Sequence, residues 1–457
     1  MTGLEANLYF NKDLKMSEQN VENKTQNFEL KMPELLFPNV FKTFRIAIQP
    51  GRLLTAFLTL AVIFLVGWVM DFHKTVVVSG RPTTFDLRNS TLSGNKTLAT
   101  ELHCYLNYPE RTDNYVKIYS ERNKDNKQGV FKVFSSFFTT NFNDTVVCLL
   151  QLRFDKVIEG ITNAFKALLW IVEYHTIYGI IFLAISFVVL SVGAGAICRG
   201  AAMHFSRDER LGFIGCIKFG IRRIVPLVFA PTSPIALACL LGFVIISVLG
   251  LIANIPYAGE ILLALFFVLV LISGGLVAAA GIWGLGSVSL MYSAIAYEKT
   301  DTFDAMCRAY NFVNERPWRL AGYTLVAAFY GSICYLFVRL VGFMMLLAGR
   351  WFLNIGLWVQ SQKGMGLEKI DAIWPEPEFF NFFGSMSGFA LPFTQKISTA
   401  VIHFEILIIS GLVMAFAFSF YFSAITVIYS LLRKKVDNTS LNSVFIETIQ
   451  TPDALQA

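Results

Sequence analysis

Residues 180–197 read IIFLAISFVVLSVGAGAI, and residues 198–226 continue CRGAAMHFSRDERLGFIGCIKFGIRRIVP. At about 1.5 Å of rise per residue, a helix that begins at Ile177 and ends at Ile197 crosses a hydrocarbon core of roughly 30 Å. The arginine-rich continuation is typical of the cytoplasmic side of a membrane protein, where short loops carry an excess of Lys and Arg. This junction therefore predicts a membrane span and its orientation.

The composition of the whole chain agrees with a membrane location. Hydrophobic residues make up 55% of the 457 residues and charged residues 15%, with a mean hydropathy of +0.55. A soluble domain carries about 25% charged residues. The net charge of +6 follows from basic loops on one side of a membrane, so we expect no nucleic-acid partner. The seven cysteines show no CxxC or Cys/His spacing, so we expect no metal site and no cofactor.

Six apolar segments are predicted to cross the membrane, with both termini in the cytoplasm. We expect the spans at residues 53–70, 177–197, 235–253, 261–297, 320–347 and 401–432. The 261–297 segment would make about 55 Å of helix, too long for one perpendicular crossing and too short for two crossings with a loop. We therefore interpret it as one tilted helix.

The polar parts of the chain divide it into seven regions. We expect a disordered cytoplasmic tail at 1–35, an interfacial helix and span one at 36–70, an extracytoplasmic insertion at 71–170, spans two to five with cytoplasmic hairpins at 171–347, an extracytoplasmic loop at 348–400, span six at 401–435 and a cytoplasmic tail at 436–457.

The insertion mixes two kinds of local pattern. The pieces TVVVSG and NYVKIYS are rich in β-branched and aromatic residues and predict a small β-rich cap. From Val130 to Leu169, apolar residues recur at helical spacing, which predicts amphipathic helices packed on the cap or on the outer membrane face. Cys104 and Cys148 both lie in this region, where a disulfide and two unpaired buried thiols are equally open alternatives.

Three segments share a pattern that indicates an internal repeat. VFKTFRIAIQPGR, FIGCIKFGIRRIVP and FDAMCRAYNFVNERPWR each show an apolar stripe, then basic residues, then a proline (Pro50, Pro226 or Pro317). Such a stripe suits a helix in the membrane interface, and proline is tolerated where a helix begins. We predict three parallel modules, each an interfacial helix plus a transmembrane hairpin; the alternative is that any alternating topology produces such likeness.

These observations define the expected fold class. It is an all-α polytopic membrane protein with about six transmembrane helices in three hairpin modules, with interfacial amphipathic helices and a small extracytoplasmic α+β insertion.

Several segments together resemble one protein family. FRIAIQPGRLL, YHTIYGIIF, GAGAICRGAAMHFSRDERLGF and DTFDAMCRAYNFVNERPWR are similar to a family of uncharacterised multi-pass membrane proteins of planctomycete-type bacteria. The resemblance covers about residues 39–350 and the last span. It implies a location in the bacterial inner (cytoplasmic) membrane, and it implies no activity and no functional residues.

Arg339 and Glu405 are the main candidates for a site within the membrane. They lie at similar depths from the outer ends of spans five and six, and His403 is close to Glu405. Ionisable groups in hydrocarbon are energetically costly, so they are functional candidates by default. We expect an Arg339–Glu405 ion pair; the alternatives are an interhelical strut or side chains that reach the near interface.

Six basic residues follow span two and are candidates to contact anionic lipids or an acidic partner, although topology alone also explains them. They are Arg199, Arg207, Arg210, Lys218, Arg222 and Arg223.

Two functional classes remain after the motifs are considered. The sequence contains no P-loop, HExxH or GxSxG motif, so we expect no catalytic residues and no enzyme. The first class is a non-catalytic scaffold or subunit of a larger membrane assembly, with protein partners or as a homo-oligomer in the lipid bilayer. The alternative is a permease or export-system membrane subunit for a lipid-like or apolar substrate, since spans nearly free of charge argue against ion coupling.

Overall fold

The computed structural model of the chain describes residues 37–78, 100–122, 127–256, 258–356, 369–384 and 392–445. Helices dominate these ranges, and six of them are long and apolar enough to cross a membrane. The predicted class, an all-α polytopic membrane protein, is therefore confirmed. The predicted tail at 1–35 lies outside the described residues, as do residues 446–457 of the second tail.

The six spans follow one another with few irregularities. They are α3 (Pro50–Met70), α9 (Thr176–Arg207), the segment α11–α12, α13 (Ala258–Glu298), α15 (Pro317–Gly356) and α17 (Phe393–Val436). The third span consists of α11 (Ile224–Leu241), a π-helical turn η3 (Gly242–Ser247) and α12 (Val248–Ala253). The fourth span is one continuous helix, as predicted. Both α15 and α17 extend beyond the predicted spans on the side of the loop that joins them, because a helix does not have to end where its most apolar stretch ends.

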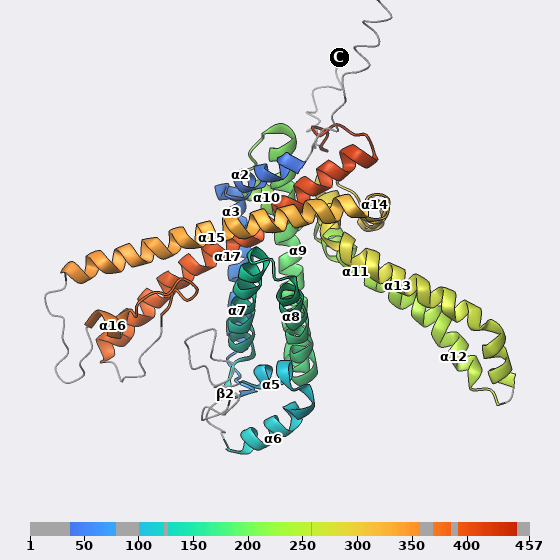
Figure 1. Ribbon diagram of the computed structural model, residues 1–457, viewed down its shortest axis with the longest axis horizontal. Coiled ribbons are helices and arrows are strands. Elements are labelled where there is room, and N and C mark those ends of the chain that lie inside the picture. The colour runs from blue at the N-terminus through green and yellow to red at the C-terminus, as the bar shows by residue number, and fades with distance from the viewer. Residues whose placement is uncertain are drawn as a thin grey trace, which may run out of the picture.

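The spans pair into three hairpins that spread from a common centre (Figure 1). We call them arm 1 (α3 and α9), arm 2 (α11–α12 and α13) and arm 3 (α15 and α17). The short helices that precede the arms are η1 and α2 (Phe37–Lys42 and Thr43–Ala47), α10 (Phe213–Arg222) and α14 (Thr302–Glu315). Pro50 and Pro317 are the first residues of their helices and Pro226 lies in the first turn of α11, where a missing N–H breaks no intrahelical bond.

All three arms meet in one buried cluster, which we call the hub. It contains buried residues of α2, α3, α9, α11, α13, α14, α15 and α17, among them Ala201, Leu227, Met291, Phe312 and Ile428. We call the end of each spanning helix that lies in the hub its hub end, and the opposite end its distal end.

Glycines of α9 let the helices of the hub approach closely. A Cβ atom at Gly193 would lie 2.2 Å from Oγ1 of Thr59 on α3, and one at Gly195 would lie 2.4 Å from Cδ1 of Leu227 on α11. Small residues bring transmembrane helices together because packing replaces the hydrophobic effect between helices in lipid. The small-residue stretch of α9 therefore joins arms 1 and 2.

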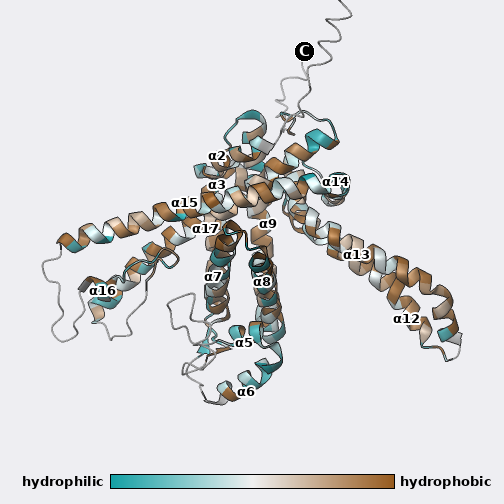
Figure 2. Cartoon of the chain, viewed as in Figure 1, coloured by the Kyte–Doolittle hydropathy of each residue, from teal (hydrophilic) through white to brown (hydrophobic). Residues whose placement is uncertain are grey.

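Arm 2 buries less of its surface than arm 1. The most apolar stretch of α9 is 39% buried, whereas the corresponding stretches of the third span and of α13 are 0% and 6% buried. Figure 2 shows arm 2 in the colours of hydrophobic residues along most of its length. Arm 2 therefore projects from the hub with apolar side chains exposed.

The insertion contains a minimal sheet and several helices, so its α+β character is confirmed. Strands β1 (Val76–Val77) and β2 (Lys127–Gln128) pair antiparallel, with Val76 opposite Gln128, and Val78 bridges to Thr100. The helices are α5 (Glu101–Asn107), η2 (Pro109–Arg111), α6 (Thr112–Arg122), α7 (Val130–Leu150) and α8 (Phe154–Tyr174).

The β-rich character predicted for NYVKIYS is wrong, because this segment lies in α6. Helical spacing places Tyr115 and Tyr119 one turn apart, with their ring centroids 4.7 Å from each other. The hydroxyl of Tyr174 on α8 donates to Asp113 Oδ1 at 2.9 Å and holds α6 against the end of α8. Aromatic pairs at this spacing stabilise helices, which here outweighs the β propensity of the same residues.

The helices α7 and α8 form a hairpin that turns back toward the hub (Figure 1). Asp71, just after α3, accepts hydrogen bonds from the backbone N–H groups of Phe131 and Lys132, both at 2.8 Å. This contact begins α7 beside the distal end of α3. The hairpin then packs along α3, α9 and α15, so it lies beside the spans as well as on the cap. A last short helix, α16 (Lys369–Ile373), packs against α17.

Candidate functional site

Arg339 of α15 is buried, with 5% of its surface exposed, and it binds oxygen atoms from two distant segments. Its Nε donates to the carbonyl of Phe379 at 2.8 Å and its Nη2 to that of Phe380 at 2.7 Å. Its Nη1 donates to Oδ1 of Asn143 on α7 at 3.2 Å and to the hydroxyl oxygen of Tyr335 at 2.8 Å. Arg339 therefore joins α15, the α7–α8 hairpin and the segment before α17.

Aromatic rings complete the surroundings of this guanidinium group. Its carbon lies 5.0 Å from the ring centroid of Phe382 and 5.3 Å from that of Phe380. Such cation–π contacts, together with carbonyl acceptors, stabilise a buried cation without a carboxylate. The cluster is an anchor for the loop rather than a reactive group.

The expected Arg339–Glu405 ion pair does not form among the described residues. Glu405 lies on an exposed side of α17, whereas Arg339 turns toward Asn143 and the loop carbonyls. His403 donates from Nδ1 to the carbonyl of Thr399 at 2.7 Å, and its ring stacks on that of Phe383. We predicted the pair because both residues lie at similar depths in the membrane. Depth does not determine which face of a helix carries a side chain.

Cys104 and Cys148 are both free thiols, so of the two alternatives the structure has the unpaired one. Cys104 lies on α5 at the distal end of arm 1. Cys148 lies 18 residues after Val130, about 27 Å along α7 toward the hub. A disulfide requires Cα atoms within about 7 Å. Burial raises the pKa of the Cys104 thiol above its usual value, so this thiol is less reactive than an exposed one.

The six basic residues predicted as lipid or partner contacts do not act as one group. Arg199 donates to the carbonyls of Ala296 and Phe445, at 2.8 and 2.7 Å, and so serves an internal contact. Arg223 lies 3.6 Å from the Asp301 carboxylate. Lys218 and Arg222 are exposed on α10, and the remaining two, Arg207 and Arg210, border two adjoining depressions at the hub end of arm 1.

The larger depression, which we call the basin, is an open cavity of about 750 Å³ between α2 and the hub end of α9. Lys42 and Arg45 contribute to it from the segment before α3, and both are exposed. Its remaining lining residues are Ile46, His204, Phe205, Ser206, Arg207, Asp208, Glu209 and Asn442. Lys42 and Arg45 were not among the residues predicted from the sequence to contact a lipid or a partner. The repeat of basic interfacial helices was the signal that could have marked them.

A chain of hydrogen bonds forms the floor of the basin. Arg52, with 1% of its surface exposed, donates from Nη2 to Nδ1 of His204 at 2.9 Å, and it also donates to the carbonyls of Ile46 and Gly200. Because Arg can only donate, Nδ1 of His204 accepts, and Nε2 carries the proton toward Asp208 Oδ1 at 3.1 Å. Among the described residues, no carboxylate lies within ion-pair distance of the Arg52 guanidinium. A buried positive charge therefore lies under the basin.

The second depression, which we call the groove, has a volume of about 350 Å³ and adjoins the basin. It lies between the first turn of α3 and the loop before α10. Its lining is mainly apolar, with Pro50, Leu54, Leu211 and Phe213 as its larger apolar side chains and Arg210 at one side; Gln49, Gly51 and Gly212 complete it.

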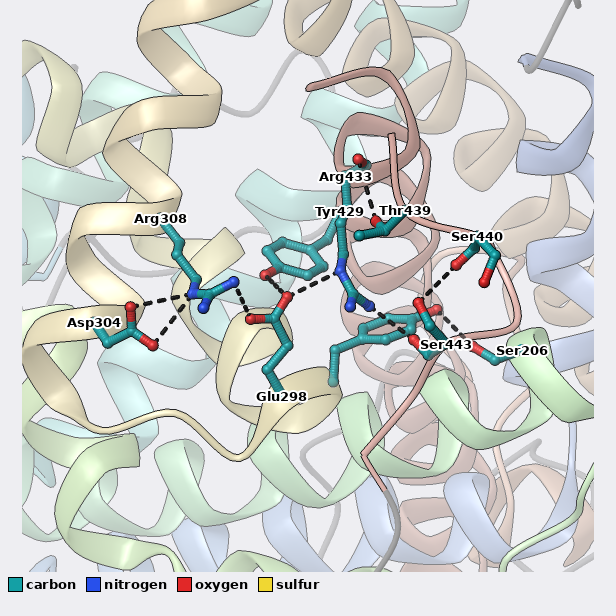
Figure 3. Close-up of polar contacts among 10 residues, drawn as sticks. Ser206, Glu298, Asp304, Arg308, Tyr429, Arg433, Thr439, Ser440 and Ser443 are labelled. Carbon is teal, nitrogen blue, oxygen red and sulfur yellow. Dashed lines mark hydrogen bonds and ion pairs between the residues drawn. The ribbon is translucent and has the colours of Figure 1, made fainter. Parts of the chain in front are cut away.

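A separate charged cluster connects the hub end of arm 2 to the hub end of arm 3 (Figure 3). The carboxylate of Glu298 binds Arg308 of α14, lies 3.0 Å from Nε of Arg433 on α17 and accepts a hydrogen bond from the hydroxyl of Tyr429 at 3.1 Å. Arg308 also binds Asp304 at 3.1 Å. The cluster connects α13, α14 and α17, and these contacts between helices indicate a structural role. In the described ranges, no group of three His, Cys, Asp or Glu side chains is placed to hold a metal ion.

Comparison of the chain with models of protein families, with curated proteins and with solved structures finds no match. The resemblance stated from the sequence therefore stays a prediction.

Proposed function

We propose that this integral membrane protein is a non-catalytic scaffold, a subunit of a larger assembly in the bacterial inner membrane. In this proposal the hub and both termini lie on the cytoplasmic side, as the excess of basic residues near the hub favours. The partners are other membrane proteins or further copies of the chain.

The observation that supports a scaffold is the exposed apolar surface of arm 2. Leu251, Leu265 and Leu285 each expose at least 70% of their surface along the arm. Lipid accepts such side chains, and so does a partner helix that packs closely against them. The Glu298 cluster fixes the hub ends of arms 2 and 3, which gives a partner a rigid surface.

Site-specific photo-crosslinking tests this proposal in native membranes. A benzophenone amino acid is placed at Leu265 on arm 2 and, as a matched control, at Leu65 on α3, which is also exposed. We expect one discrete protein adduct from Leu265 and only lipid adducts from Leu65. Lipid adducts alone from Leu265, together with a monomeric protein in mild detergent, would contradict the scaffold.

A permease for a lipid-like substrate is the second candidate, and the irregular third span favours it. Pro231 and Pro234 lie inside α11, and the π-helical turn η3 follows. Discontinuous helices and π-helical turns often occur at the functional sites of transporters. Purified protein in vesicles should then accelerate the movement of a fluorescent lipid between leaflets. A rate equal to that of empty vesicles would remove this candidate.

A further inference from the structure

We propose that the basin and the groove together bind one anionic phospholipid, with its phosphate headgroup in the basin and an acyl chain along the groove. This inference goes beyond the scaffold and does not depend on it.

The charges of the basin favour an anion. Its two acidic side chains already have partners, since Asp208 contacts His204 at 3.1 Å and Glu209 lies 3.9 Å from Arg207. Within the described ranges, no acidic side chain lies within ion-pair distance of Lys42 or Arg45. Their charges add to that of buried Arg52 below the floor, so the basin carries net positive charge and suits a phosphate.

The groove has the chemistry of an acyl-chain site. Leu54, Leu211 and Phe213 line it, and Leu54 exposes 49% of its surface. Its wall is formed by close backbone contact, because a Cβ atom at Gly51 would lie 3.3 Å from the carbonyl oxygen of Leu211. The groove begins at the first turn of α3, where the chain enters the apolar span. An acyl chain in this place is continuous with the bilayer.

The two depressions share a boundary and so form one amphiphilic site. Gln49 lines the groove, and its side-chain amide lies 3.2 Å from Nε2 of His204 in the basin. Glu209 of the basin and Arg210 of the groove are neighbours in the chain. A free phosphate needs only the basin, whereas a phospholipid of the adjacent leaflet uses both depressions. The geometry therefore favours the lipid.

Native mass spectrometry of the full-length protein in detergent tests the site, with phosphatidylglycerol as the anionic lipid and phosphatidylcholine as the zwitterionic one. The double variant K42Q/R45Q removes two exposed cations of the basin, and Lys218→Gln removes an exposed cation of α10 outside it. At about 1 kcal/mol per basic residue, we expect the double variant to bind phosphatidylglycerol about 30-fold more weakly. We expect Lys218→Gln to bind it like the parent protein.

Further measurements distinguish binding of the lipid from binding of a soluble phosphate, and a loss of charge from misfolding. Leu54→Gln should weaken binding of phosphatidylglycerol, and glycerol 3-phosphate should not compete with the lipid. The charge-preserving variant K42R/R45K should restore binding, which shows that the double variant acts through charge. Equal retention of both lipids, equal losses in Lys218→Gln and K42Q/R45Q, or full competition by glycerol 3-phosphate would each overturn the proposal.

Discussion

Replacing Gly193 by alanine should push α3 and α9 apart within the hub. The new Cβ atom would lie 2.2 Å from Oγ1 and 2.6 Å from Cγ2 of Thr59, whereas ordinary contacts begin at 3.4 Å. Thr59 cannot easily turn away, because it is buried and its hydroxyl donates to the carbonyl of Thr55 at 2.8 Å. The helices must therefore separate by about 1 Å, and overpacking of this kind lowers the free energy of unfolding by about 1–3 kcal/mol.

Denaturation in mixed micelles, followed by tryptophan fluorescence, measures this effect. The matched control is Gly274→Ala on arm 2, where a Cβ atom meets nothing within 4 Å, so the free energy of unfolding should stay constant or rise by up to about 1 kcal/mol. Thr59→Ala removes the two closest atoms, so the double variant with Gly193→Ala should recover part of the loss. Equal stability of Gly193→Ala and Gly274→Ala would refute the close packing of α3 on α9.

Three further changes test other parts of the structure. Glu298→Gln should lower the free energy of unfolding by about 1–3 kcal/mol, because it leaves the largely buried Arg433 without a carboxylate, whereas the more exposed Arg308 keeps Asp304. Thermal denaturation measures this, and Asp304→Asn at the exposed edge should cost less than about 1 kcal/mol. Cys307 is exposed and should react quickly with a maleimide in the folded protein, whereas Cys216 is buried, which raises the pKa of its thiol, so its labelling at pH 7 should require denaturation. Arg339→Leu should release the loop that its guanidinium holds, seen as faster cleavage by an added protease. Equal labelling of the two thiols, or unchanged cleavage, would contradict the corresponding contacts.

The sequence predicted those features that depend on solvent alone. Apolar length located the six spans, and the structure has six helices long and apolar enough to cross a membrane among its described residues. These predictions succeed because a bilayer imposes one length and one polarity on every crossing.

Contacts between distant segments could not be predicted in the same way. Arg339 meets Asn143, which lies 196 residues earlier, because α7 turns back along the spans. Nothing in the alternation of polar and apolar residues specifies that return. The basin likewise joins Lys42 and Arg45 of one segment to His204 of another, and the packing of α2 and α3 on α9 brings them together.

The turns that follow the second helix of each arm have features in common. Asp208 (φ 56°) and Lys299 (φ 58°) directly follow α9 and α13, and Asn438 (φ 51°) lies two residues after α17. A left-handed residue commonly ends a helix, and Leu152, with φ 60°, lies two residues after α7 in the same way, so the turn alone does not indicate a repeat. Pro226 is the eighteenth residue after Asp208, and Pro317 is the eighteenth residue after Lys299. The same turn and the same spacing place α10 and α14 before arms 2 and 3, which agrees with the proposed repeat, and the repeat stays a prediction.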